Sequence, residues 1–217
     1  MGKLKYFLPL LLLIFVSCKK TKEYSISSDI KQYFDYHKGS YWIYRNDSTG
    51  LFDSTYVKSY SNTSGIAYGA GIKVETINFD YKSKFLGNSY ISYVACGGPD
   101  YYTLSSIVIK SPADTERTTQ VVAYSPNWAP NSTITPNCSL DGIYFYHTKS
   151  ADTIANIPYQ NLIYSEYRTA DTSEFNPFLF IRRICFAKNV GIIKYYEFDR
   201  HNNINRSYTL IRDSVVQ

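Results

Sequence analysis

One stretch sets the fold of this chain: Tyr33-Phe34-Asp35-Tyr36-His37-Lys38-Gly39-Ser40-Tyr41-Trp42-Ile43-Tyr44. Its first part predicts a short helix over residues 29–36, which Ser28 caps and which ends near Gly39. Gly39 permits a tight turn, because glycine adopts backbone conformations that strain other residues. In the strand that follows, alternation places Trp42 and Tyr44 on one face, where they bury a large apolar area. The stretch therefore predicts that a polar leader enters a β-sheet at this point.

Strand signals dominate the rest of the sequence. Tyr occurs 23 times and Phe 12 times among 217 residues, and aromatic and β-branched residues favour strands. Residues 62–65 and 199–205 are expected to form turns, and Gly69 and Gly71 to allow a bulge. Short turns without intervening helical patterns predict an antiparallel sheet. The predicted strands are residues 41–45, 54–60, 66–79, 90–96, 104–110, 118–124, 142–148, 162–168, 178–187, 191–199 and 207–213.

The quoted stretch also resembles the opening of a group of uncharacterised bacterial lipoproteins, in which an aromatic pair and a glycine precede Trp-x-Tyr. The segment Val190-Gly191-Ile192-Ile193-Lys194-Tyr195-Tyr196, with the later Leu210-Ile211, resembles their closing hairpin. The resemblance implies an all-β fold: an antiparallel, open or half-closed β-barrel like that of periplasmic lipoprotein carriers. Those carriers usually lay helices across the concave face, whereas this chain predicts at most one short N-terminal helix. The structural signature consists of Gly39, Trp42, Tyr44 and Gly191.

A closed, lipocalin-like barrel is the alternative fold. Lipocalins also begin with a glycine and a tryptophan on the first strand, but one residue separates the two. Here Ser40 and Tyr41 both intervene, which favours the open barrel. Strands near the two termini are expected to pair, because that pairing helps to close the edges of the sheet.

The N-terminus predicts an export signal. Lys3 and Lys5 precede an apolar run, residues 7–16, that is too short to span a bilayer as a helix, which takes about 20 residues. Val16-Ser17-Cys18 then resembles the lipobox of bacterial lipoproteins, with Phe15 where leucine is usual. The resemblance implies that residues 1–17 are a removable signal peptide. It also implies that Cys18 becomes the lipid-bearing first residue of the mature chain, labelled by palmitate.

Residues 18–27 are expected to hold the lipidated cysteine and a polar tether, ahead of a single β domain over residues 28–217. Two or more acyl chains attach a protein stably to a membrane. Lys19 stands where retained lipoproteins of enteric bacteria have aspartate, so the resemblance implies the outer membrane. No acidic cluster of the kind that directs lipoproteins to the cell surface follows Cys18, which favours the periplasmic face.

The composition argues against several chemistries. Without Lys3 and Lys5 the mature chain has 21 basic and 18 acidic residues, scattered along the sequence, so it lacks the basic patch of a nucleic-acid-binding protein. There is no Gly-x-Ser-x-Gly elbow, no glycine-rich phosphate loop, and no Cys-x-x-Cys or Cys/His spacing. We therefore expect no enzyme activity, no cofactor and no metal site.

Three cysteines remain after Cys18. Cys96 and Cys138 lie beside turn signals, at residues 97–99 and 136–137, where two loops can meet, and an oxidising compartment lets them form a disulfide. Cys185 lies within a strand-like run and is expected to be a buried free thiol. As a nucleophile it would need a histidine partner that the sequence does not identify.

Other candidate residues have simpler interpretations. Asp152, Asp171 and Glu174 are of the residue type that glycoside hydrolases use in pairs, but they lie in turn-like stretches and are expected to be solvated. His147 is expected to lie at the surface or rim of the sheet. Trp128, in the loop of residues 125–141, is either a lid packed on the core or an exposed contact residue.

The predicted function is that of a lipid-anchored, non-enzymatic binding or structural protein of the cell envelope. In one variant an apolar ligand lies in the barrel concavity, lined by Tyr, Phe and Ile. In the other, exposed Tyr and Trp form a flat patch for a glycan or an envelope protein, because aromatic side chains give contact area at low entropic cost. An envelope hydrolase is a third alternative, which requires converging carboxylates or a Cys–His pair in a cleft.

Lipidation is tested by palmitate labelling of the wild type and of Cys18→Ala. We expect label in the wild type alone, and we expect the variant to leave the detergent phase because it lacks the acyl chains. Equal labelling of the two proteins, or a Cys18→Ala protein that stays in the detergent phase, would refute the anchor.

Overall fold

The computed structural model describes residues 22–26, 28–66, 72–83, 91–96, 104–110, 118–124, 133–134, 142–169, 180–200 and 203–217. Within these ranges the chain forms one short helix, α2 (Ser28–Phe34), and thirteen strands of a single sheet. The strands are β1 (Lys22–Tyr24), β2 (Tyr41–Asn46), β3 (Phe52–Ile66), β4 (Ile72–Ser83), β5 (Ile91–Cys96), β6 (Leu104–Lys110), β7 (Thr118–Tyr124), β8 (Thr133–Ile134), β9 (Gly142–Ile154), β10 (Ile157–Thr169), β11 (Phe180–Ala187), β12 (Gly191–Asp199) and β13 (Ile204–Ser214).

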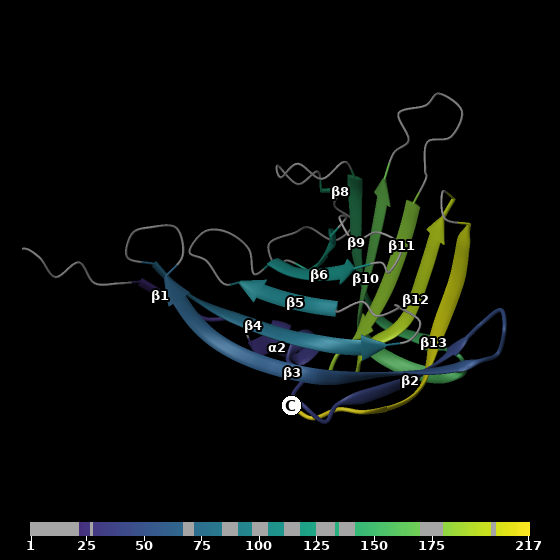
Figure 1. The fold of residues 1–217 in the computed structure, drawn as a ribbon, viewed down its shortest axis with the longest axis horizontal. Helices are drawn as coiled ribbons and strands as arrows, with labels where there is room; N and C mark the ends of the chain where they lie inside the picture. The colour runs from purple at the N-terminus through teal and green to yellow at the C-terminus, as the bar shows by residue number, and fades with distance from the viewer. Residues whose placement is uncertain are drawn as a thin grey trace, which may run out of the picture.

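The sheet consists of two antiparallel meanders that meet at one seam (Figure 1). Strands β2 to β7 follow one another in the first meander and β8 to β13 in the second, and the seam is the pairing of β2 with β13. The strand order ends at β7 and β8, so the sheet is open, although its curvature brings β7 close to β10 and β9. The open or half-closed antiparallel barrel is therefore confirmed, and the closed lipocalin-like alternative is wrong.

Two side-chain hydrogen bonds on the inner face of the sheet reinforce the seam. Trp42 and Tyr44 share that face, as predicted, and both are almost completely buried. The Trp42 indole N–H donates to the carbonyl of Val190 over 2.6 Å, and the Tyr44 hydroxyl donates to the carbonyl of Ile192 over 2.8 Å. Because Val190 and Ile192 flank the start of β12, each bond reaches past β13 and ties β2 to the second meander.

Aromatic side chains from the helical segment complete this contact. The Tyr36 ring meets Trp42 edge-on, with ring centroids 5.2 Å apart. Gly191 has a φ of +99°, and a Cβ at this position would lie 3.2 Å from the Tyr36 ring. Gly191 therefore provides both the backbone conformation and the space that the Tyr36–Trp42 pair needs. On α2, Phe34 packs edge-on against Phe186, with centroids 5.1 Å apart.

Most strands lie where the sequence predicts them. Residues 104–110, 118–124 and 191–199 match β6, β7 and β12 residue for residue, and Gly39, with a φ of +107°, forms the predicted turn into β2. The turn predicted at residues 62–65 is wrong, because these residues pair with β4 and extend β3. A continuous ladder with β4 satisfies their backbone groups and outweighs the local turn preference of asparagine and glycine.

Residues 22–26, which the sequence assigns to the tether, are docked on the sheet. β1 pairs in parallel with the start of β4, and Ile26 is buried in the core. Glu75 on β4 accepts from the backbone N–H of Ile26 at 2.9 Å and binds the ammonium of Lys31 on α2 at 2.7 Å. These bonds hold residues 22–26 and α2 against β4. Residues 22–26 are therefore part of the folded domain, and Cys18 itself lies outside the described residues.

A buried ion cluster ties three neighbouring strands of the second meander. Glu197 on β12 binds Arg182 of β11 at 2.8 Å and Arg206 of β13 at 2.5 Å, and Arg182 is only 1% exposed. Burial alone would raise the pKa of Glu197, but the two guanidinium groups outweigh it and lower that pKa. Without either arginine, the charge of the buried Glu197 carboxylate would be only partly compensated. A buried charge that lacks a partner strongly destabilises the fold.

The role of Gly191 is tested by Gly191→Ala, with Gly65→Ala as a matched control. Gly65 lies in β3 with open space at its Cβ position and no positive φ, so alanine there should leave stability almost unchanged. At Gly191 the strained backbone alone should cost about 1–3 kcal/mol of unfolding free energy, with the Tyr36 contact adding to it. Urea unfolding measures both. If Gly191→Ala and Gly65→Ala were equally stable, the Tyr36–Trp42 contact would not depend on glycine at position 191.

Candidate functional site

One row of side chains crosses the outer face of the sheet, opposite the core. Residues paired across an antiparallel ladder point to the same face, so the register identifies the members of the row. His147, Lys194 and Arg45 of this row are exposed to solvent. We call it the central row, and from β9 through β13 to β2 it consists of His147, Tyr164, Cys185, Lys194, Thr209 and Arg45.

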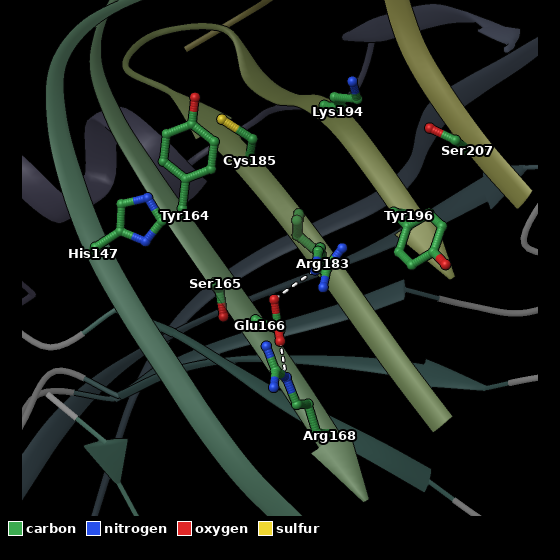
Figure 2. A pocket seen from close by; sticks show the side chains of 11 residues that line it. His147, Tyr164, Ser165, Glu166, Arg168, Arg183, Cys185, Lys194, Tyr196 and Ser207 are labelled. Atoms are coloured by element: carbon green, nitrogen blue, oxygen red, sulfur yellow. Dashed lines mark hydrogen bonds and ion pairs between the residues drawn. The ribbon is translucent and has the colours of Figure 1, made fainter. Parts of the chain in front are cut away.

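A second row lies beside the central row and completes a groove (Figure 2). This neighbouring row consists of Glu166, Arg183, Tyr196 and Ser207, paired across β10 to β13. Side chains of both rows line a pocket of about 520 Å³. A second pocket, of about 620 Å³, shares Tyr164 and Lys194 with the first and extends to Arg45 and Asp47. We call the two pockets together the outer-face groove.

At one end of the groove, Tyr164 contacts His147 and Asp152. The His147 ring stacks on the Tyr164 ring, with centroids 4.6 Å apart and planes inclined by 2°. The Tyr164 hydroxyl donates to Asp152 at 2.8 Å, and Lys149 binds the same carboxylate oxygen at 2.8 Å. Hydrogen bonds from Lys149, from Tyr164 and from the backbone of Thr153 lower the pKa of Asp152 to about 2. Burial and the bond to Asp152 raise the pKa of Tyr164.

These contacts correct the prediction for Asp152. The sequence assigns Asp152 to a solvated loop, but it lies within β9, because the hairpin turns later, at Ala155 and Asn156, which both have positive φ. Asp171 and Glu174 lie outside the described residues. His147 is exposed at the surface of the sheet, as predicted.

In the neighbouring row, Glu166 is shared by two arginines. It binds Arg168 of its own strand, and it binds Arg183 of β11 at 2.5 Å (Figure 2). Burial alone would raise the pKa of Glu166, but the bonds from Arg168 and Arg183 outweigh it and lower that pKa. The Arg183 guanidinium also lies over the Tyr196 ring, 5.3 Å from its centroid. The cluster therefore carries a net positive charge beside an aromatic face.

Two further cations of the groove have no carboxylate partner among the described residues. They are Lys194 on β12 and Arg45 on β2, and both are exposed. Asp47, which lines the same pocket, instead accepts from the hydroxyls of Ser207 at 2.6 Å and Thr209 at 3.0 Å. Four Lys or Arg side chains and three Asp or Glu side chains line the two pockets, so the groove carries a positive excess.

Cys185, which is buried in the central row as Thr209 is, is a free thiol, as predicted. Burial raises its pKa to about 12, so the thiol stays protonated at neutral pH and is a poor nucleophile. The predicted disulfide is not tested, because Cys138 and the side chain of Cys96 lie outside the described residues, as does Trp128.

None of the residues that the sequence singles out as a structural signature lines the groove, and three of the four are buried in the core. Trp42, Tyr44 and Gly191 meet at the seam, and Gly39 forms the turn that leads into it. The groove residues were missed because their assembly depends on the register between distant strands. The available signal was that polar side chains alternate with buried ones along β12, where Lys194 is exposed between the buried Ile193 and Tyr195.

Comparisons with known proteins identify no family. No family model matches the chain, and no curated protein matches it. Among solved structures, a protein from Bacteroides fragilis described as exported, with a YmcC-like fold, has 10% identity and a TM-score of 0.40, over 82% of this chain and 97% of that chain. A protein from Parabacteroides distasonis described as a lipoprotein has 11% identity and a TM-score of 0.40, over 82% and 96%. Similarity at this level does not transfer a function.

No helix in the part of the chain that the structure describes is long and apolar enough to cross a membrane. Across the same described ranges, no group of three or more His, Cys, Asp or Glu side chains is placed to hold a metal ion.

The Asp152 contacts are tested by NMR titration of its carboxyl carbon. We expect a midpoint near pH 2, below the 3.8 of an unperturbed aspartate. Since the folded-state pKa is the lower one, the carboxylate favours the folded state above pH 3.8, and this contribution is lost as the pH falls towards 2. Lys149→Gln should move the midpoint upwards. A wild-type midpoint of 3.8 would show that these bonds do not form in solution.

Proposed function

We propose that the protein is a lipid-anchored, non-enzymatic binding protein of the cell envelope. It is attached to the outer membrane through Cys18, faces the periplasm, and binds its ligand in the outer-face groove. The supporting observation is the groove itself, in which two adjoining pockets share Tyr164 and Lys194 on the solvent side of the sheet. A concave site with aromatic walls and a few directed polar groups is the usual form of a ligand site.

The ionisable groups of the groove favour binding over catalysis. A general acid or base works best with a pKa near the operating pH. Here every group with a shifted pKa is shifted away from neutrality. Asp152 and Glu166 are held ionised, whereas Tyr164 and Cys185 are held protonated. These groups therefore present fixed charges and fixed donors to a ligand.

The exposure of the tyrosines supports the outer face over the concave face. Tyr36, Tyr44 and Tyr195 point inward and are buried against the core and α2, so the protein's own side chains occupy the described part of the concave face. Tyr164 and Tyr196, in contrast, are partly exposed on the outer face and line the groove. A groove for an external ligand accounts for this distribution better than a concavity for an apolar ligand.

β1 and the β2–β13 seam lie at opposite ends of β3 (Figure 1), and the groove extends onto the seam at Arg45 and Thr209. β1 pairs with the start of β4, opposite the end of β3, whereas Arg45 of the groove pairs with Phe52 at the start of β3. The fifteen residues of β3 measure about 50 Å along the strand. Residues 19–21 separate Cys18 from β1, a reach of about 14 Å. A lipid at Cys18 would thus hold the β1 end near the membrane and present the groove away from it.

The binding site is tested by site-specific photocrosslinking of the full-length protein in cells. Benzoylphenylalanine is placed at Tyr196, in the groove, and at Tyr56, an outward-facing tyrosine of β3 that is 41% exposed, as the control. Benzophenone inserts into C–H bonds, so it records glycan, lipid and protein ligands alike. We expect a discrete adduct at position 196 and none at position 56. Adducts at neither position, or equally at both, would contradict a ligand site in the groove.

A further inference from the structure

We propose that the ligand of the outer-face groove is an acidic glycan, a chain of sugar rings that carry carboxylates. This inference rests on the proposed function and names the ligand class of the same site. It follows from three properties of the groove: a floor of fully paired strands, cations without carboxylate partners among the described residues, and aromatic rings in the central and neighbouring rows.

At the floor of the groove, only side chains are available to recognise a ligand. β10 to β13 and β2 are each paired on both sides, so their backbone groups are taken up by the ladder. An extended peptide that joins a sheet needs a free edge, and the floor strands offer none, because each has a neighbouring strand on both sides. A ligand that lies across the floor is therefore bound through side chains, which suits a polymer with hydroxyl and charged groups on each unit.

The charges select an anion. Lys194 and Arg45 belong to strands that are two steps apart in the sheet, with Thr209 of β13 between them, so their backbones are about 10 Å apart. Neither has a carboxylate partner among the described residues, and both face solvent. Each can therefore meet a carboxylate of the ligand without breaking an existing ion pair. The Arg183–Glu166–Arg168 cluster adds a third positive region.

The uncharged groups suit sugar rings. Tyr164 and Tyr196 are partly exposed, and the ring face that His147 leaves free on Tyr164, or Arg183 on Tyr196, suits the apolar face of a pyranose unit. The Ser207 hydroxyl donates to Asp47 but can still accept a hydrogen bond from a sugar hydroxyl. The central row also continues beyond Arg45 to Phe52, its partner on β3. Phe52 is 66% exposed and the adjacent Leu51 is 70% exposed. From Tyr164 to Phe52 the row spans five strand spacings, about 24 Å, which accommodates several sugar units between two aromatic ends.

The ligand class is tested by calorimetric titration of the full-length lipoprotein in detergent micelles. The probes are hexagalacturonate, the neutral maltohexaose, and hexaglutamate as an acidic peptide. We expect hexagalacturonate to bind, the other two to bind at least about tenfold more weakly, and the affinity for hexagalacturonate to fall with added salt. The double variant Arg45→Gln/Lys194→Gln should weaken binding about tenfold. Lys82→Gln, an exposed lysine on β4 outside the groove, should leave it unchanged.

Each contrary outcome identifies what is wrong. If hexaglutamate bound as tightly as hexagalacturonate, the ligand would be an acidic peptide and not a glycan. If maltohexaose bound as tightly, charge would have no role in recognition. Binding that survives in the Arg45→Gln/Lys194→Gln variant, with its melting temperature unchanged, would place the glycan elsewhere. An adduct at position 196 without hexagalacturonate binding would overturn the glycan and leave the proposed function standing. No adduct, together with no binding, would overturn both.

Discussion

The pairing of β2 with β13 is the interaction on which the rest of the structure depends. Hairpins hold each meander together, and this seam joins the two. A two-stranded contact is marginal by itself. Here it is reinforced from the inner face, because Trp42 and Tyr44 each donate a hydrogen bond across β13 to the start of β12. Gly191, which lies between the two accepting residues, leaves the space that the Tyr36 ring fills against Trp42.

The same seam carries the groove on its other face. Successive side chains of a strand point to opposite faces, so β12 sends Tyr195 to the core and Lys194 to the groove. Thr209 and Arg45 face each other across the seam, so the groove extends onto the first meander only where β2 and β13 are paired. The inner face provides stability, and the outer face is free to carry the charged side chains of the proposed binding site.

The sequence predicts the local parts of this molecule better than their long-range assembly. Alternation suffices to place Trp42 and Tyr44 on one face, because that pattern is a property of a single strand. The meeting of Tyr164, Cys185 and Lys194 could not be predicted, because a register shift after Cys185 sets which residues face each other. β1 was also missed, since its pairing with β4 links residues that lie about fifty positions apart and leaves no local pattern.

Native-state hydrogen exchange at the seam tests this dependence most directly. If β2 and β13 hold the two meanders together, their hydrogen-bonded amides exchange only when the whole domain unfolds, with the same free energy and denaturant dependence as the most protected amides of β11 and β12. The opposite result is exchange of the β2 and β13 amides at a clearly lower free energy while both meanders stay protected. That result would show that the halves are stable without the seam, and it would contradict the role given to it here.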